Sequence, residues 1–418
     1  MKILFLVKFF HPFDRGGSEW STHDLARALT RKGHEITVVT PNYGAKNNEV
    51  IEGIKIIRMP FPKKLSNKQS SIAPYWTNNL IWYTTSTIYC LYIILKGKYQ
   101  VIHIQNNEFL PAGIIAGYIT KKPSIATFRD YQSLCNLGFC LWKSNKVCNL
   151  GRYLKHDFQF FYQNYVAEKS LLKYTTLLLA ALRGFFTQKI LYFFAKKLTA
   201  RIAVSQKVAE IFSANGIKNL KVIHNVVLIN SKPKSNKEGE IIYTGKLSKG
   251  KGIDLLFKTL PGVLEKLKGV NVSIIGSGHL EKFLKKYVQE KGIENLVKFE
   301  GHMPHALVLE KIINASLVVV PSVWPEPLPR SIIETVLSGT PIVATDVGGN
   351  KEIIKNNFYG NLVRPQVEDI KRGIINTYKN KNIYKKNIMG DLDHLKKYFS
   401  EETVASYETV YSNLINNK

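Results

Sequence analysis

Two glutamates separated by seven residues are the strongest chemical signal in the sequence. Glu326 and Glu334 lie in the proline-rich stretch PSVWPEPLPRSIIE, residues 321–334, directly after an apolar run that predicts a buried strand. The prolines stiffen the loop and delay the helix, so Glu334 is expected about one turn into that helix. A carboxylate can accept from two neighbouring sugar hydroxyls, and the N–H groups at a helix start suit a phosphate. A bare pair of acids at this spacing is usually solvent-exposed, but the flanking strand, prolines and downstream glycines favour a site.

Two lysines upstream could supply the positive charge that a diphosphate needs. Lys246 and Lys251 stand in the stretch YTGKLSKGKGID, residues 243–254, flanked by Gly245 and Gly252. Lysines in so basic a chain can also be ordinary solvated residues, and the flanking glycines favour the binding interpretation.

Short glycine-containing segments follow strands in both halves of the chain. Gly276, in the run Gly-Ser-Gly, opens a helix and fits one wall of a base pocket, whose remainder we expect near residues 301–304. Gly16 and Gly17 follow the first strand, where they would let a ligand approach the start of the next helix. A simple turn is the alternative for the second pair.

The elements that must position these residues alternate between strand and helix. Short apolar, β-branched strands between helices predict parallel sheets covered on both faces. The alternation restarts after the polar, Lys-rich segment 231–239, which predicts a domain boundary. The fold class is therefore α/β, with two Rossmann-like domains facing a cleft and ligands at the carboxyl ends of the strands. The expected strands cover residues 2–7, 35–40, 54–59, 101–105, 124–127, 201–205, 240–243, 270–275, 297–300, 317–320 and 341–344, and residues 218–225 are expected to form a short strand and turn.

With these motifs the chain resembles glycosyltransferase family 4, the retaining enzymes of the GT-B fold. The spacing of Glu326 and Glu334 is that family's hallmark, and the segments 345–352 and 360–363 resemble its following turns. The resemblance covers nearly the whole chain and is strongest over residues 245–363. It implies that Glu326 contacts the donor sugar and that Glu334 binds the ribose of the nucleotide.

The resemblance also implies roles for the basic pair and the glycine loops. In the family an Arg and a Lys grip the donor diphosphate; Lys251 matches the Lys, whereas Lys246 stands in place of the Arg and lacks its bidentate fork. The donor-binding set implied in this way is Gly16, Gly17, Gly245, Lys246, Lys251, Gly276, Glu326, Leu328, Arg330, Ser331 and Glu334.

Residues expected to serve the acceptor lie in the first half. His103 stands in a strand resembling one that ends at the family's cleft, and a packed strand residue is the equal alternative. Many relatives carry His-Asp where this chain has Arg129 and Asp130, followed by Tyr131. Arginine cannot exchange a proton near neutral pH, so Arg129 would hold an anionic group instead, with Asp130 orienting it or the acceptor. The expected catalytic residues are Glu326, Lys246, Lys251, Arg129 and Asp130.

The resulting prediction is a retaining hexosyltransferase that uses a UDP- or GDP-sugar and a glycan or lipid-linked glycan acceptor, in cell-surface polysaccharide synthesis. The expected domains are residues 1–228 for the acceptor, 229–390 for the donor, and a terminal helix in 391–418 that returns to the first domain. No cofactor or metal is expected, because the lysines can stabilise the diphosphate and no Asp-x-Asp motif occurs. A catalytically inactive binding subunit and a nucleotide-sugar epimerase are the alternatives.

Charge and hydropathy restrict the kinds of binding partner that the chain can have. The chain has 59 Lys and Arg against 31 Asp and Glu, a net charge of +28, without a nucleic-acid-binding motif. An anionic membrane surface suits that charge better than nucleic acid, although compositional bias also contributes. The start at residues 1–7 predicts a strand rather than an export signal. The apolar stretches 75–95 and 171–198 predict amphipathic helices packed on a sheet, with a membrane-lying helix as the alternative. We therefore expect a cytoplasmic protein, peripheral to the inner face of the membrane.

Four cysteines complete the inventory of reactive side chains. Cys135, Cys140 and Cys148 lie close together at spacings that match no standard zinc pattern, and Cys90 is separate. Free or structural thiols in a reducing cytoplasm are expected, with a local metal clip or a redox pair as the alternative.

Overall fold

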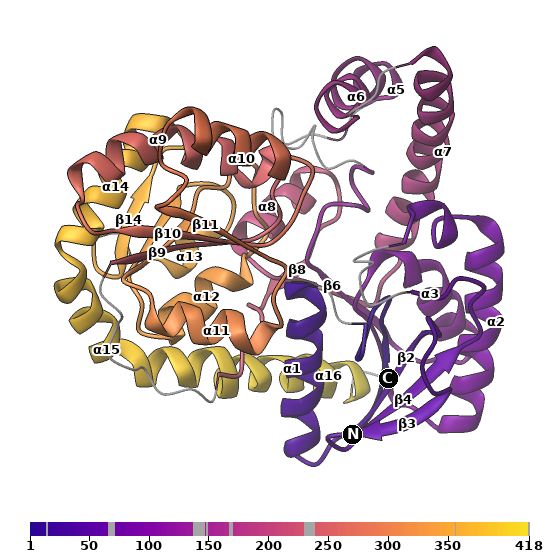
Figure 1. Cartoon of the computed structure of the whole chain (residues 1–418). Coiled ribbons are helices and arrows are strands. Elements are labelled where there is room, and N and C mark those ends of the chain that lie inside the picture. The colour runs from indigo at the N-terminus through magenta and orange to yellow at the C-terminus, as the bar shows by residue number, and fades with distance from the viewer. Residues whose placement is uncertain are drawn as a thin grey trace. The chain divides into compact units, whose positions relative to one another are not determined.

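The computed structural model describes residues 1–13, 16–65, 72–136, 147, 149–166, 170–229, 239–355 and 357–416. The chain forms two compact units (Figure 1). Unit 1 comprises Met1–Val226 with Phe399–Lys418, and unit 2 comprises Val227–Tyr398. Our domain prediction changed units after residue 228 and returned from residue 391, whereas the structure returns to unit 1 at Phe399. Of the Lys-rich segment 231–239, all but Gly239 lies outside the described residues.

Unit 1 is built on an eight-stranded sheet with the order β3-β4-β2-β1-β5-β6-β7-β8. Neighbouring strands are parallel except β3 and β4, which pair antiparallel at one edge. The interior strands β1 and β6 are buried along almost their whole length, as a parallel sheet covered on both faces requires. The strands are β1 (Lys2–Leu6), β2 (Glu35–Pro41), β3 (Asn48–Ile51), β4 (Ile54–Met59), β5 (Val101–Ile104), β6 (Ser124–Phe128), β7 (Ala200–Ala203) and β8 (Leu220–Val222).

Helices and short helical turns connect these strands. Asn79 caps α2 through its side-chain oxygen, which accepts from the Trp82 amide, so the helix begins later than the predicted residue 75. The elements are α1 (Gly17–Arg31), η1 (Pro74–Trp76), α2 (Leu80–Gly97), η2 (Asn107–Phe109), α3 (Leu110–Ile119), α5 (Leu150–Arg152), η3 (Tyr153–Phe158), α6 (Gln159–Tyr165), α7 (Leu171–Ala195) and α8 (Gln206–Ala214).

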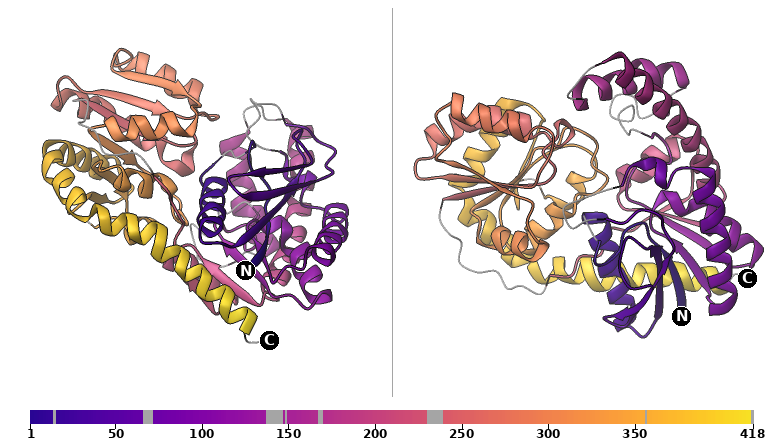
Figure 2. Two further views of the ribbon diagram at one scale, coloured as in Figure 1. Left: turned by 90° about the horizontal axis from the view of Figure 1, so that it is seen from below. Right: turned by 45° about the vertical axis from the view of Figure 1, so that its right-hand side comes forward.

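Helix α7 differs from the packed amphipathic helix that we expected. None of its first ten residues is buried, and its buried residues are Ala181, Phe185, Gln188, Leu191 and Ala195. The first half extends away from the sheet of unit 1, with α5 and α6 near its start (Figure 2). Within the described part of the chain, α7 alone has the length and apolar composition that a bilayer span would need. Helix α7 packs against α3, so it is held on unit 1.

Unit 2 contains a six-stranded parallel sheet with the order β11-β10-β9-β12-β13-β14. The central strand β12 has the sequence Leu-Val-Val-Val and is fully buried, because helices cover both faces of the sheet. Its strands are β9 (Glu240–Thr244), β10 (Asn271–Ile275), β11 (Val297–Gly301), β12 (Leu317–Val320), β13 (Ile342–Thr345) and β14 (Gly360–Val363). Its helices are η4 (Lys249–Lys251), α9 (Ile253–Lys266), α10 (Glu281–Glu290), α11 (His305–Asn314), α12 (Arg330–Leu337), α13 (Asn350–Ile353), α14 (Val367–Lys379) and α15 (Lys381–Lys397).

The last helix, α16 (Thr403–Asn416), belongs to unit 1, after the turn η5 (Tyr398–Glu402). Its side chains Tyr407 and Tyr411 are buried. The Tyr411 hydroxyl lies 2.7 Å from Nδ1 of His103 on β5. Glu408 accepts from Lys32 at 2.6 Å, and its carboxylate lies 2.8 Å from Nε2 of His34. The predicted return of the terminal helix to the first domain is confirmed.

Candidate active site

The loop after β12 holds Glu326 in a buried, hydrogen-bonded position. The Glu326 carboxylate accepts from the Lys251 ammonium at 2.6 Å and from the Ser322 hydroxyl at 2.8 Å. Its side chain is 5% exposed, whereas that of Lys251 is 35% exposed. Lys251 therefore connects a buried acid to the surface, where its ammonium can also meet an anionic ligand.

Close backbone approaches bring Lys251 and Glu326 together. A Cβ on Gly252 would lie 1.8 Å from the Pro321 carbonyl oxygen, so only glycine allows η4 to pack this closely on the loop. The Gly250 carbonyl accepts from the amides of Val323 and Trp324 in the same loop. The predicted pair of acid and amine, 75 residues apart in the sequence, is therefore fixed by the backbone of unit 2.

Glu334 lies on α12, one turn after the helix begins. Its Oε1 accepts from Arg330 Nε at 2.6 Å and lies 2.7 Å from His305 Nε2, at the start of α11. Burial alone would raise the pKa of Glu334, but the hydrogen bond from His305 and the charges of Arg330 and His305 outweigh it and lower that pKa. The side chain is thus a fixed, ionised acceptor.

A cationic cluster surrounds the turn after β9. Lys246 is exposed there, and its carbonyl accepts from the buried Tyr243 hydroxyl at 2.9 Å. Partial burial and the nearby charges of Lys246 and Lys249 lower the pKa of His279, which follows β10. A lowered histidine pKa beside lysines indicates a locally positive potential that suits phosphate groups.

The remaining residues of the predicted donor set lie after β9, β10 and β12, at the start of α12, or at the start of α1. Leu328 and Arg330 are buried, whereas Ser331 is half-buried at the start of α12. Gly245 and Gly276 stand at the ends of neighbouring strands, and a Cβ on Gly276 would lie 2.0 Å from the Gly245 carbonyl oxygen.

In unit 1, Gly16 is the cap residue of α1 and Gly17 is its first residue. The Gly16 carbonyl accepts from the Trp20 amide at 3.1 Å, so this turn opens directly into the helix. The half-buried Arg129 guanidinium donates to Gln105 and, at 3.0 Å, to Asn225.

Asp130 has partners other than the arginine beside it. Its carboxylate accepts from the Asn107 side chain at 2.6 Å and from the Gln132 amide at 2.9 Å. Burial raises the pKa of Asp130 to about 6, with Glu108 adding to the rise and Gln132 opposing it. A carboxyl group with this pKa can exchange a proton near neutral pH, which Arg129 cannot.

His103 and Tyr131 lie in the interior of unit 1. His103 is 0% exposed, and its two ring nitrogens lie within hydrogen-bonding distance of Tyr411 and Thr127. Tyr131 is buried beside Phe212. These positions correspond to the packed-residue alternative for His103, and they place Tyr131 in the core rather than at a surface that an acceptor would touch.

The cysteine region yields no site among the described residues. Cys90 is a buried free thiol, and burial raises its pKa to about 12. Cys135 is also buried. Cys140 and Cys148 lie outside the described residues. In the part of the chain with described coordinates, no group of three or more His, Cys, Asp or Glu side chains could hold a metal ion.

Two histidines in the site of unit 2 were missing from our sequence analysis. His305 contacts Glu334 across 29 residues, and the electrostatic neighbours of His279 are Lys246 and Lys249. The signal for His279 was its position directly after the Gly276 segment at the end of a strand. His305 follows a proline at a helix start, which alone does not indicate a partner on another helix.

Comparison with known proteins assigns the chain to a family. Residues 227–389 match the family described as glycosyl transferases group 1, and residues 15–229 match glycosyltransferase family 4. A glycosyltransferase of Methanocaldococcus jannaschii that is itself uncharacterised is 24% identical over 384 residues, which cover 88% of this chain and 86% of that protein.

Solved structures share the whole two-domain architecture. Sucrose-phosphate synthase of Thermosynechococcus elongatus is similar with a TM-score of 0.73 and 16% identity, and the match covers 100% of both chains. HepE of Anabaena, solved in complex with UDP and glucose, has a TM-score of 0.67 and 20% identity, covering 99% of this chain and 100% of the other. The chain therefore belongs to glycosyltransferase family 4 and is a sugar-transferring enzyme with the two-domain α/β GT-B fold.

Proposed function

We propose that this enzyme transfers a hexosyl group, with retention of configuration, from a UDP- or GDP-sugar to a hydroxyl of a glycan or lipid-linked glycan. Cell-surface polysaccharide synthesis is the proposed setting. The observation that carries the proposal is the buried Glu326 carboxylate, hydrogen-bonded to Lys251 in a loop that leads directly to Glu334. The UDP and glucose bound by the similar HepE favour a UDP-sugar as the first donor to test.

Three sets of side chains in unit 2 would each bind one part of the donor. Glu334, held ionised by Arg330 and His305, would accept from the vicinal hydroxyls of the ribose. Glu326 would accept from hydroxyls of the transferred sugar. Lys246 and Lys251 would bind the diphosphate, with His279 beside them.

In the proposed reaction, the acceptor oxygen forms a bond to the anomeric carbon on the face from which the nucleotide leaves. The bond between that carbon and the diphosphate oxygen breaks, and the departing diphosphate takes the proton of the acceptor hydroxyl. Lys246 and Lys251 would stabilise the charge that develops on the diphosphate. We propose that the lysines serve this role without a metal ion.

Unit 1 would serve the acceptor. Arg129 would hold an anionic group of the acceptor, because its guanidinium is fixed by Gln105 and Asn225. Asp130, with its pKa raised to about 6, would accept from an acceptor hydroxyl near neutral pH. We further propose that the enzyme is cytoplasmic and peripheral to an anionic membrane, in keeping with its charge of +28.

A thermal-shift comparison of UDP- and GDP-sugars tests the donor site. The correct donor should raise the melting temperature of the protein, because it binds the native state. Glu334→Gln removes the charge that Arg330 and His305 hold and should abolish this rise, whereas Glu265→Gln, at an exposed position of α9, should leave it intact.

Removing a buried carboxylate beside Arg330 can destabilise unit 2, so a second variant is needed. Lys246→Met changes an exposed side chain and should weaken donor binding about tenfold or more while the fold is retained. A normal donor-induced rise in both Glu334→Gln and Lys246→Met would refute the proposed donor site.

A further inference from the structure

Two helices of unit 1 each expose a line of large apolar side chains. The exposed residues recur every seven positions, which is close to two helical turns, so each set forms one stripe along its helix. Their side chains are between 56% and 77% exposed. The stripes consist of Ile81, Ile88 and Leu95 on α2 and Leu172, Leu179, Phe186 and Phe193 on α7.

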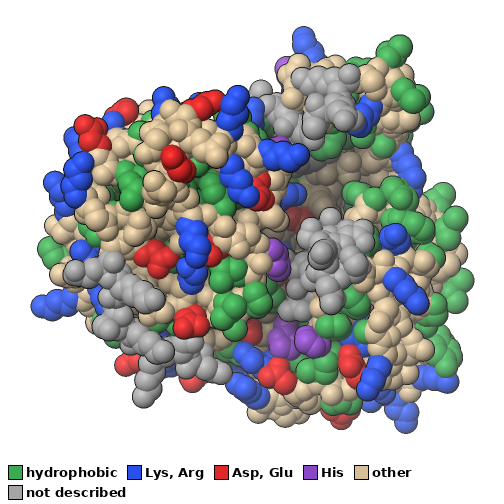
Figure 3. Space-filling view, viewed as in Figure 1, with side chains coloured by type: hydrophobic (Ala, Val, Ile, Leu, Met, Phe, Trp, Pro, Cys, Tyr) green, Lys and Arg blue, Asp and Glu red, His purple; other side chains and the backbone are tan. Residues whose placement is uncertain are grey.

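The same helices carry basic residues and no acidic ones. The sequence contains no Asp or Glu from Gly53 to Asn107 or from Lys169 to Ala209, stretches that include α2 and α7 entirely. Basic side chains accompany the apolar stripe of α7 and continue beyond it, at Lys173, Arg183, Lys189, Lys196 and Lys197. Figure 3 shows hydrophobic and basic side chains together at the surface where these helices lie. We call this area the α2–α7 surface.

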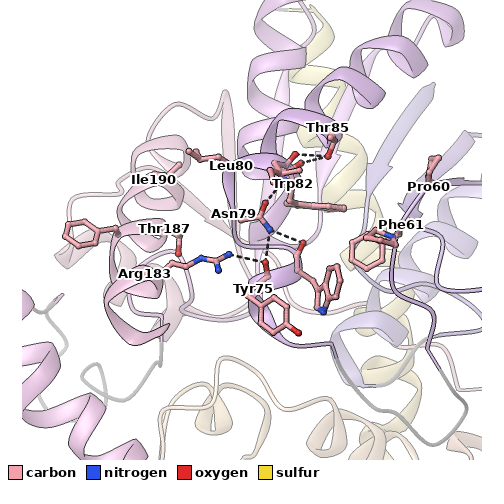
Figure 4. Close-up of a pocket in the computed structure, with 14 residues that line it drawn as sticks. Pro60, Phe61, Tyr75, Asn79, Leu80, Trp82, Thr85, Arg183, Thr187 and Ile190 are labelled. Atoms are coloured by element: carbon pink, nitrogen blue, oxygen red, sulfur yellow. Dashed lines mark hydrogen bonds between the residues drawn. The ribbon is translucent and has the colours of Figure 1, made fainter. Parts of the chain in front are cut away.

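An apolar groove opens within the α2–α7 surface. Its volume is about 820 Å³, within the range of sites that bury a drug-sized ligand. Side chains from the loop after β4, from η1, from the start of α2 and from α7 line it (Figure 4). Those that matter for the argument are Phe61, Trp76, Leu80, Ile81, Phe186 and Ile190.

Several polar groups at the groove have partners within unit 1. The Arg183 guanidinium donates to the carbonyls of Tyr75 and Asn78 at 3.1 and 3.2 Å, which ties α7 to the start of α2 (Figure 4). The Asn79 side chain donates to the Tyr75 carbonyl at 2.7 Å, and the Trp82 indole donates to the Glu108 carbonyl at 3.1 Å. The groove thus presents mainly hydrocarbon and ring faces to its occupant.

We propose that an anionic lipid bilayer docks on the α2–α7 surface and that the groove receives a hydrocarbon chain of one lipid. Apolar stripes flanked by lysine and arginine, without acids, match the acyl region and the negative headgroups of such a bilayer. A second copy of this chain would bring one basic surface against another, which charge repulsion disfavours. Helix α7 packs against α3 and carries basic residues near its middle. Both features favour a helix that lies on the bilayer over one that crosses it.

This inference assigns a surface to the membrane association proposed above. Its test measures binding only, so it can fail while glycosyl transfer persists, and the reverse also holds. The probes are vesicles of phosphatidylcholine alone and vesicles of phosphatidylcholine and phosphatidylglycerol in equal parts.

Flotation of the full chain with these vesicles tests the surface. The protein should float with the anionic vesicles, should bind the neutral ones much less, and should be released by salt as the charges are screened. Leu179→Ser with Phe186→Ser should lower partitioning about tenfold or more. The matched control is Phe283→Ser with Leu307→Ser in unit 2: Phe283 is 59% exposed, against 60% for Phe186.

Brominated acyl chains test the groove itself, because bromine quenches a tryptophan only at contact. Vesicles made with brominated phosphatidylglycerol should quench part of the fluorescence of the protein. Trp76→Phe combined with Trp82→Phe should remove most of that loss, since both side chains line the groove. Trp324→Phe, in unit 2, should leave the quenching unchanged.

Three results would overturn the proposal. The first is equal binding by the α7 variant and its unit 2 control, and the second is no preference for anionic vesicles. The third is a concentration-dependent dimer in sedimentation that Leu179→Ser with Phe186→Ser abolishes, because the stripes would then face a second copy of the chain. Quenching that is undiminished in the variant with both Trp76→Phe and Trp82→Phe would show that no lipid chain enters the groove.

Discussion

At the scale of single side chains, Glu326 shows how much of the site residue types and spacing can predict. The two glutamates follow from one short motif and the two lysines with their flanking glycines from another, each placed after a predicted strand. Their partners depend on packing that a local pattern does not contain. His305 reaches Glu334 only because α11 and α12 are neighbours, and Ser322 reaches Glu326 because the loop turns back.

In the first half of the chain, the local sequence pattern does not decide the role of a residue. His103 stands in an apolar strand, where a cleft residue and a core residue have the same local pattern. The partner that distinguishes them, Tyr411, lies 308 residues further on. Burial with two hydrogen bonds makes His103 a structural residue, and that role has a pH signature.

The stability of unit 1 should decrease as the pH falls below about 6.5, because burial and the charge of Arg129 lower the pKa of His103 well below that value. Below 6.5 the unfolded chain binds a proton at His103 that the native state does not, so unfolding is favoured. The stabilisation is complete above the unfolded pKa and is lost as the pH falls, at up to about 1.4 kcal/mol per pH unit.

Hydrogen exchange of the β5 amides measures this effect in the intact two-unit protein. The free-energy difference between the parent chain and His103→Gln should rise with pH up to about 6.5 and then level off. The difference between the two proteins cancels the opposite contribution of Asp130, whose pKa is raised. A difference that stays constant over this range would show that His103 is not held neutral.

At the scale of elements, the strands and most helices were predictable because buried β-branched runs alternate with amphipathic segments. The exposed edge strand β3, with the sequence Asn-Glu-Val-Ile, has no such run and was not predicted. The strand β14 was also missing from the expected strands. The helices α14 and α15 were likewise missing from the prediction. For α7 the apolar period was visible, but whether that stripe meets a sheet or solvent is decided by the tertiary structure.

The contact between η4 and the loop after β12 gives a prediction for these elements. Gly252→Ala should destabilise unit 2 by several kcal/mol, since the new Cβ would lie 1.8 Å from a carbonyl oxygen, and donor binding should weaken as Lys251 moves. Gly292→Ala is the matched control, because Gly292 also has a positive φ, 63° against 65°, but no atom within 4 Å.

The control should cost only about 1–2 kcal/mol, from the left-handed backbone alone. Thermal unfolding and donor titration of both variants measure the two effects. Equal losses in Gly252→Ala and Gly292→Ala would mean that the loop can move aside and that Lys251 does not depend on this contact.

At the scale of the whole molecule, unit 1 is discontinuous in sequence. Its sheet comes from the first 226 residues, whereas α16 comes from the end of the chain. Two buried tyrosines of α16 meet the buried histidine of β5, so the terminal helix completes the core instead of only covering it.

Deletion of residues 399–418 should therefore destabilise unit 1 and leave unit 2 folded. The loss exposes the apolar surface that α16 covers and leaves His103 without the Tyr411 hydroxyl. Hydrogen exchange should rise throughout β1 and β5 and stay near its parent level in β9 and β12. The milder change Tyr411→Phe should cost unit 1 about 1–3 kcal/mol, from the buried imidazole nitrogen left without its partner.

Uniform loss of protection in both units after the deletion would contradict this division. Unchanged stability of unit 1 in Tyr411→Phe would show that His103 finds another partner.

The discontinuity of unit 1 also has a consequence for synthesis on the ribosome. The strand that carries His103 emerges early, but its tyrosine partner is translated only after all of unit 2. Unit 2 of a nascent chain can thus fold completely while unit 1 still lacks α16. The apolar surface that α16 covers stays exposed until this helix leaves the exit tunnel. Until then, the uncovered flank of the first sheet is where a chaperone would be expected to bind.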